Sequence, residues 1–225
     1  MSAKPSAREK ILEAALNLIR AKGYAATSVD DLCAAAGVTK GAFFHHFASK
    51  EDLAVKAADY WSETTSAFFA AAAYHDCADP LDRVLGYIDF RKALLKGAIP
   101  EFTCLVGTMV QEAYESHPAI REAVDRSISG HAAKVEGDIA EAMRLRGLGA
   151  NWTAESLALH AQAVLQGAFV LAKAKGAAAI AVDSVDHLRR YIELLFSGTE
   201  ARRRAMTDGQ KAESAGRKSP TPAPP

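Results

Sequence analysis

The chain has 225 residues, of which 49% are hydrophobic and 8% aromatic, so it can bury a core and has a globular composition. Its 27 Lys and Arg residues balance 27 Asp and Glu residues, which argues against a general nucleic-acid coat protein. No apolar run approaches the length of a membrane span, and the polar start MSAKPSAREK lacks the apolar segment of a signal peptide. We therefore expect a cytoplasmic protein without a membrane partner.

The charges are unevenly distributed along the chain. Residues 1–50 carry a net charge of +3, residues 51–200 carry −7, and residues 201–225 carry +4. A basic end on an acidic body suits a protein that presents one end to a phosphate backbone.

The sequence offers no pattern of a catalytic or metal site. Cys33, Cys77 and Cys104 are an odd number without metal-ligand spacing, and His75 and Asp76 beside Cys77 lack a fourth ligand. No Ser/His/Asp arrangement, phosphate loop or dinucleotide fingerprint is present. We expect reduced cysteines, no metal, no cofactor and no enzymatic activity.

The N-terminal part of the chain predicts two helices after a disordered start at residues 1–6. An apolar stripe over residues 7–22 indicates the first helix, which a glycine ends. Thr27 followed three residues later by Asp30 resembles a capping box, so the second helix is expected over residues 28–36.

A third short helix follows almost at once. Gly37 is a helix-ending glycine, and Thr39 is the next N-cap, so this helix is expected over residues 40–46. Two short helices joined by a tight turn form a helix-turn-helix, whose second helix enters the DNA major groove. The alternative at this point is an ordinary helical hairpin within an all-α core.

The remaining sequence predicts six more helices and no strands, which gives about nine helices and an all-α fold. We expect them at about residues 50–74, 80–96, 103–114, 118–146, 153–176 and 184–196. Residues 199–225 are polar and rich in proline, and are expected to be a disordered tail.

The segment GVTKGAFFHHFASKEDL, preceded by TSVDDLCAAA, resembles the N-terminal domain of the TetR/AcrR family of bacterial transcriptional regulators. The resemblance implies a helix-turn-helix DNA-binding domain at residues 7–50, with its motif at residues 28–47. It also implies a ligand-binding and dimerisation domain at residues 51–198.

The start of the third helix would reach the base edges of DNA. Lys40 can donate to guanine, Ala42 can contact a thymine methyl group, and Gly41 permits close approach. Phe43 and Phe47 are expected in the core, and His46 is expected to be structural. With the contacts that the resemblance adds, the expected DNA-binding residues are Thr27, Ser28, Thr39, Lys40, Gly41, Ala42, Phe44, His45 and Lys50. Phe44 stands where the family commonly has a tyrosine whose hydroxyl contacts a phosphate.

The resemblance further implies a homodimer on a pseudo-palindromic double-stranded DNA operator and an apolar cavity for a small-molecule effector. The expected cavity residues are Trp61, Phe90, Phe102, Cys104, Met109, Tyr114, Gln162, Gln166 and Phe169. The expected dimer residues are Ala161, Val164, Leu165, Ala168 and Ala172, although the same stripe is also compatible with internal core.

The segment around Cys104 resembles regulators related to the electrophile-sensing repressor of the N-ethylmaleimide response, which suggests a reactive cysteine as a second trigger. The resemblance favours a dimeric repressor that a small-molecule effector releases from its operator. The alternatives are an activator of the same family and a helical binding module without sequence-specific DNA recognition.

Overall fold

The computed structural model describes residues 4–216, with side chains described up to Ser197. Every regular element in this range is helical, which confirms the all-α fold. The elements are α1 (Ala7–Lys22), α2 (Val29–Ala36), α3 (Lys40–His46), α4 (Lys50–Ala70), the 3-10 helix η1 (Ala73–Asp76), α5 (Pro80–Ala93), α6 (Ile99–Phe102), α7 (Leu105–Ala113), α8 (Pro118–Leu145), α9 (Ala154–Lys175) and α10 (Ala179–Gly216).

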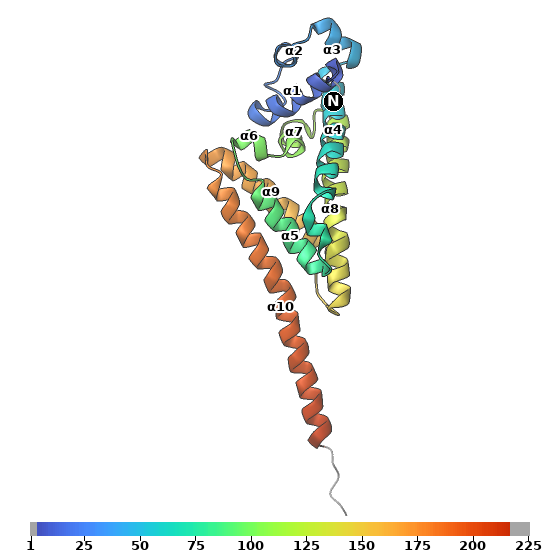
Figure 1. The fold of residues 1–225 in the computed structure, drawn as a ribbon, viewed down its shortest axis with the longest axis vertical. Helices are drawn as coiled ribbons and strands as arrows, with labels where there is room; N and C mark the ends of the chain where they lie inside the picture. Colours follow the sequence, from blue (N-terminus) through green and yellow to red (C-terminus); the bar gives the residue numbers. More distant parts are fainter. Residues whose placement is uncertain (1–3, 217–225) are drawn as a thin grey trace, which may run out of the picture.

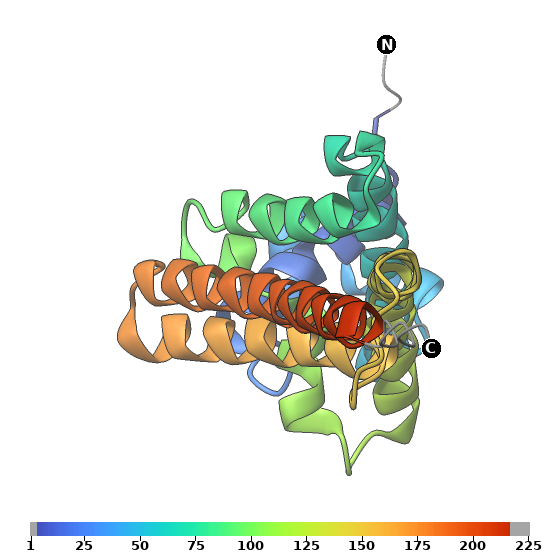
Figure 2. The same cartoon turned by 90° about the horizontal axis from the view of Figure 1, so that it is seen from below.

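Helices α1 to α3 form a head at one end of the molecule, and α4 leads from this head into a body built of α5 and α7 to α10 (Figure 1). Helix α8 packs on both α4 and α9, and α10 packs on α9 and α5. Seen from below, α9 and α10 lie side by side (Figure 2).

Two cores of buried side chains hold these helices together. The first core joins residues of α1 to α3 with residues of α4, α7 and α8, among them Leu105 and Ile120, which are both fully buried. The second core lies deeper in the body, between α5, α8, α9 and α10. Because the first core includes body helices, the head is packed directly against the body rather than tethered by α4 alone.

Helix α10 differs from its expected bounds at both ends. It begins at Ala179 rather than at Ser184, and it continues through Gly198 to Gly216 instead of ending there. Alanine, arginine, glutamate and lysine are strong helix formers, and each interior glycine costs only about 1 kcal/mol. The helix therefore replaces the expected disorder over residues 199–216. Residues 1–3 and 217–225 lie outside the described residues.

The region after α5 also differs from expectation, and this difference gives ten helices among the described residues rather than nine. The segment expected as one helix at 103–114 is preceded by a separate single turn, α6, which begins after Gly97. Gly97 has a positive φ of 80°, a conformation that suits glycine and allows the chain to reverse there.

Candidate nucleic-acid interface and ligand cavity

The turn between α2 and α3 is built by caps at both helix starts. Ser28 caps α2, its hydroxyl accepting from the amide of Asp31 while the Asp31 carboxylate accepts from the Ser28 amide. The capping box therefore lies one residue later than the expected pair of Thr27 and Asp30. Gly37 is left-handed with φ of 64°, and the Thr39 hydroxyl accepts from Ala42 N at 3.2 Å to begin α3.

Two aromatic side chains fix the orientation of α3. Phe43 and Phe47 are buried in the first core, as expected, and they pack together with Ile11 and Leu12 of α1. With this face turned inward, the opposite face of α3 is open to solvent. Its exposed residues are Thr39, Lys40, Gly41, Phe44 and His45, while Ala42 and His46 are half-buried.

Two of the expected phosphate-binding side chains instead have structural roles. Thr27 is buried, and its hydroxyl donates to the carbonyl of Gly23 at 2.7 Å. The Lys50 ammonium donates to the carbonyls of Tyr24 and Thr27, both at 3.0 Å, and lies 4.3 Å from the centre of the Tyr24 ring. These side chains hold the turn between α1 and α2, and their expected contacts with DNA stay predictions.

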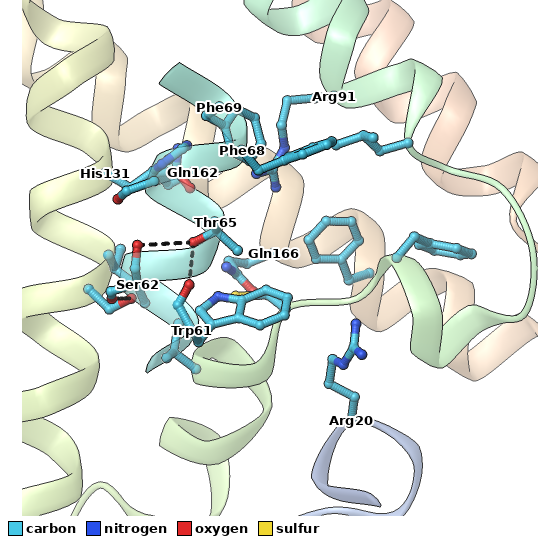
Figure 3. A pocket seen from close by; sticks show the side chains of 18 of the residues that line it. Arg20, Trp61, Ser62, Thr65, Phe68, Phe69, Arg91, His131, Gln162 and Gln166 are labelled. Carbon is cyan, nitrogen blue, oxygen red and sulfur yellow. Dashed lines mark hydrogen bonds between the residues drawn. The ribbon is translucent and has the colours of Figure 1, made fainter. Parts of the chain in front are cut away.

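A cavity of about 320 Å³ opens between α4, α5, α6, α8 and α9 in the body (Figure 3). Six of the expected cavity residues line it: Trp61, Phe102, Cys104, Gln162, Gln166 and Phe169. The sequence analysis missed several of the other wall residues, notably Arg20, Phe68, Phe69, Arg91, Glu101 and His131. No local pattern marks these residues, because they come from five different helices.

The other three expected residues lie elsewhere. Phe90 packs against the rings of Phe68, Phe69 and Tyr74, and is not among the residues that line the cavity. Met109 is fully buried in the first core, and Tyr114 is 56% exposed at the end of α7. Helical periodicity placed all three on plausible faces, but it cannot say which inward face meets a void.

A buried hydrogen-bonded chain forms one side of this cavity. Gln162 Nε2 donates to the hydroxyl oxygen of Tyr87 at 3.1 Å, and this oxygen lies 3.0 Å from His131 Nε2. Burial, together with the nearby charges of Arg91 and Lys134, lowers the pKa of His131 to about 4. The imidazole is therefore neutral at physiological pH.

Cys104 is half-buried at the N-cap position of α7, before the first helical turn in which it was expected. It lines the main cavity and also a neighbouring one of about 240 Å³, whose wall includes Thr108 and Lys173. Lys173 Nζ donates to the Thr108 hydroxyl at 3.0 Å. A cavity-lining position gives a small electrophile a route to the thiol.

The structure corrects the expected dimer residues. Ala161, Leu165, Ala168 and Ala172 are buried in the second core and Val164 packs against it, so these side chains stabilise the single subunit. The opposite face of α9 is exposed and largely apolar, and two large apolar side chains of α10 are exposed as well. The large exposed residues are Leu159, Val170 and Leu171 of α9 and Tyr191 and Leu194 of α10.

Helix α9 is also the one helix among the described residues that is long and apolar enough to cross a membrane, and 44% of its apolar 18-residue stretch is buried in the structure. A helix with one face in a core and an apolar face outside has this composition without entering a membrane. The exposed stripe therefore accounts for the high hydropathy.

The sequence matches two family models. Residues 11–57 match the model for bacterial regulatory proteins of the tetR family, and residues 80–192, half of the chain, match the tetracyclin repressor-like C-terminal domain. A TetR transcriptional regulator from Chloroflexus aurantiacus has 28% identity and a TM-score of 0.70, over 83% of this chain and 94% of that one. The reduced form of NemR from E. coli has the same fold, with 20% identity and a TM-score of 0.71 over 82% and 95% of the two chains.

Curated relatives are similar mainly in the head. The HTH-type transcriptional repressor KstR2 of Mycobacterium tuberculosis (strain ATCC 25618 / H37Rv) is 34% identical over 87 residues, which are 36% of this chain and 40% of that protein. The HTH-type transcriptional regulator AcrR of Shigella flexneri is 46% identical over 46 residues, which are 20% and 21% of the two chains. These matches span less than half of each relative.

Proposed function

Because this chain belongs to the TetR family of bacterial regulatory proteins, and is therefore a helix-turn-helix transcriptional regulator, we propose that it is a homodimeric repressor of a pseudo-palindromic operator. A small molecule in the 320 Å³ cavity would release it. The observation that carries this proposal is the open face of α3, which presents Lys40, Gly41, Phe44 and His45 to solvent while Phe43 and Phe47 anchor the helix. A protein that acts on DNA in this way works in the cytoplasm.

The open face of α3 suits the major groove. Lys40 stands at the first turn, where side chains of a recognition helix reach base edges, and Gly41 adds no side chain to keep the backbone away. Phe44 is 56% exposed, and an apolar ring at this position can contact thymine methyl groups although it cannot donate to a phosphate. Ser28 is exposed at the start of α2, where the N-terminal end of the helix can meet a phosphate.

The exposed stripe of α9 and α10 supports a twofold dimer. Both helices run side by side (Figure 2), and the ring of His160 on α9 lies 5.2 Å from that of Tyr191 on α10. Pairing this face with its copy would bury Leu159, Val170, Leu171 and Leu194. A twofold dimer presents two α3 helices and therefore requires two half-sites of inverted sequence.

The packing of the head on the body supports release by a ligand. Arg20 of α1 reaches into the cavity wall, so an element of the DNA-binding head contacts the space that a ligand would fill (Figure 3). A ligand lowers DNA affinity only to the extent that it prefers the arrangement of the head that does not fit DNA.

A footprint of the purified protein on the promoter region flanking its own gene, in reducing buffer at physiological salt, tests the function. We expect two protected half-sites separated by one or more helical turns, and loss of protection with Lys40→Ala. The matched control is Lys96→Ala, which changes an exposed lysine of the body. Salt-sensitive protection without a preferred site would instead indicate a binding module driven by phosphate contacts alone.

A reporter gene downstream of the protected site separates repression from activation, since deletion of a repressor raises expression and deletion of an activator lowers it. Modification of Cys104 is a second candidate trigger, because this thiol lines the cavity. We expect an alkylating agent to release operator from the wild type and not from Cys104→Ser. Equal release from both proteins would exclude the cysteine as a trigger.

A further inference from the structure

Arg91 differs from the other half-buried arginines of the body. Within residues 51–197, Arg83 pairs with Asp138 and Glu141, Arg146 pairs with Asp79, and Arg189 pairs with Asp89 and Glu193. Arg91 has no carboxylate partner among the described residues, although the adjacent Lys92 is held by Asp186 at 2.7 Å. A half-buried cation without a counter-charge is unfavourable unless something else neutralises it.

The Arg91 side chain lies in the cavity wall with its guanidinium near two aromatic rings. Its central carbon is 5.3 Å from the ring centre of Phe69 and 5.8 Å from that of Phe169. Cation–π contacts of this kind help to hold the guanidinium in place but leave its N–H groups unused. These groups can form the two parallel hydrogen bonds that a carboxylate accepts.

The rest of the wall is suited to a flat ring system. Five aromatic side chains line the cavity: Trp61, Phe68, Phe69, Phe102 and Phe169. A cavity of 150 Å³ lined by apolar side chains holds benzene, so about 320 Å³ offers space for about two fused rings with a substituent.

His131 is a neutral group in the cavity wall. The Tyr87 oxygen accepts from Gln162 Nε2 and lies 3.0 Å from His131 Nε2, and the imidazole tautomer sets the direction of this second hydrogen bond. With a pKa lowered to about 4, the imidazole brings no second positive charge to this part of the wall. The positive charge here is therefore that of Arg91.

A second arginine enters the cavity from the head. Figure 3 shows Arg20 and Arg91 reaching toward the space from opposite sides. Arg20 donates to the carbonyls of Leu16 and Glu101 and to Asn17 Oδ1, and its guanidinium lies 5.2 Å from the Trp61 ring. None of these partners is charged, so Arg20 also lacks a carboxylate partner among the described residues. The nearby Glu101 carboxylate accepts a hydrogen bond from the backbone amide of Ala98, the residue before α6.

We propose that the cavity binds an aromatic carboxylate of about two fused rings, with its carboxylate on Arg91, and that Arg20 transmits its presence to the DNA-binding head. The bound anion would attract Arg20 and compete with the Glu101 carbonyl that now fixes α1 against α6. Only the transmission by Arg20 rests on the proposed repressor function. The ligand class can be tested without DNA.

Isothermal titration calorimetry of the full-length protein with three probes of one shape tests the ligand class. The probes are 2-naphthoate, its neutral amide and the cationic 2-naphthylmethylammonium. We expect naphthoate to bind at least tenfold more tightly than the amide, and the cation to bind most weakly. Equal affinities for naphthoate and amide, or no naphthoate binding at millimolar concentration, would overturn the proposal.

Arg91→Gln separates the charge from the cavity itself. This variant should bind naphthoate at least tenfold more weakly but bind the amide as the wild type does, which also shows that the cavity is intact. The control Arg144→Gln, an exposed arginine near the end of α8, should leave both affinities unchanged. Undiminished naphthoate binding by Arg91→Gln would refute the anchoring role.

Arg20→Gln tests the transmission on the footprinted operator. We expect it to bind unliganded operator within about threefold of wild type and to bind naphthoate more weakly, because one attracting charge is lost. At naphthoate concentrations that saturate each protein, the variant should lose most of the ligand-induced release. Arg20→Lys, which keeps the charge, should recover part of that release. Full release from Arg20→Gln would show that Arg20 does not transmit. If no operator is found, the calorimetry still decides the ligand class.

Discussion

Lys40 of α3 and Asp30 of α2 form an ion pair across the turn of the helix-turn-helix, with 2.7 Å between Nζ and Oδ1. The hydrogen bond to Asp30 raises the pKa of Lys40, so the ammonium is fully charged at physiological pH. Both side chains are more than half exposed, and exposed pairs contribute only about 0–1 kcal/mol to folding. The pair therefore matters more for DNA binding than for stability. A base contact by Lys40 requires its ion pair with Asp30 to break, and it brings the DNA phosphates close to the negatively charged Asp30 carboxylate.

Asp30→Asn should increase the affinity for DNA. The substitution frees Lys40 and removes a negative charge from the phosphate-facing surface, so we expect operator binding several-fold tighter and unfolding free energy within about 0.5 kcal/mol of wild type. Fluorescence anisotropy with labelled operator, measured over a range of salt concentrations, checks this. Asp59→Asn on α4 makes the same charge change away from the turn, and an equal gain from that control would contradict the local explanation.

Lys50→Met should destabilise the head without removing a phosphate contact. The ammonium loses its hydrogen bonds to the carbonyls of Tyr24 and Thr27, and hydrogen bonds to charged groups contribute about 1.5–3 kcal/mol. Urea denaturation should show a loss in this range, and operator affinity should fall with the same dependence on salt. If the slope of log affinity against log salt concentration were instead smaller in magnitude by about one, Lys50 would be shown to contact a phosphate.

The sequence predicted the head almost residue by residue, because its signals are local. A cap, a stop glycine and a second cap lie within twelve residues, and the buried pair Phe43 and Phe47 follows from helical spacing. The single shift, from Thr27 to Ser28 as the cap, came from two adjacent hydroxyl residues with two adjacent carboxylates downstream. Their spacing is identical, and only the packing of Thr27 against Gly23 distinguishes them.

The body could not be predicted at the same level, because its features depend on which helices meet. Helix α9 is apolar on two faces, and its sequence does not say that Ala168 faces the second core while Val170 faces solvent. Whether Arg91 has a carboxylate partner likewise depends on how the helices pack, and among the described residues it has none. The sequence after Gly198 lacks large apolar residues, which favours disorder, but its strong helix propensity continues α10 to Gly216.

The exposed stripe of α9 and α10 and the buried face of α9 should respond differently to substitution. Leu194→Asp, at a position on α10 that is 69% exposed, should shift the protein toward monomer and weaken operator binding while leaving the monomer folded. Ala168→Leu, on the buried face, should instead cost about 1–3 kcal/mol of stability through overpacking. Sedimentation velocity and urea denaturation separate the two effects.

Leu145→Asp is the matched control for this experiment, since Leu145 is 54% exposed at the end of α8 and lies off the stripe. It should leave the oligomeric state unchanged. A wild-type protein that is monomeric at micromolar concentration, or an unaltered Leu194→Asp dimer, would contradict the assignment of this face.

The stability of the protein should fall in mild acid because of His131. Its pKa in the folded protein is about 4, below the ordinary value of 6.5, owing to burial and to the charges of Arg91 and Lys134. Between these two values the unfolded chain binds a proton that the folded protein does not. The contribution of His131 to the free energy of unfolding is therefore fully present above pH 6.5 and is lost as the pH falls, reaching a loss of about 3 kcal/mol at pH 4.

His131→Gln, which cannot take up this proton, should lose stability less steeply than wild type when urea denaturation is repeated from pH 7 to pH 4. Parallel curves for the two proteins would show that the imidazole binds its proton as readily in the folded protein as in the unfolded chain.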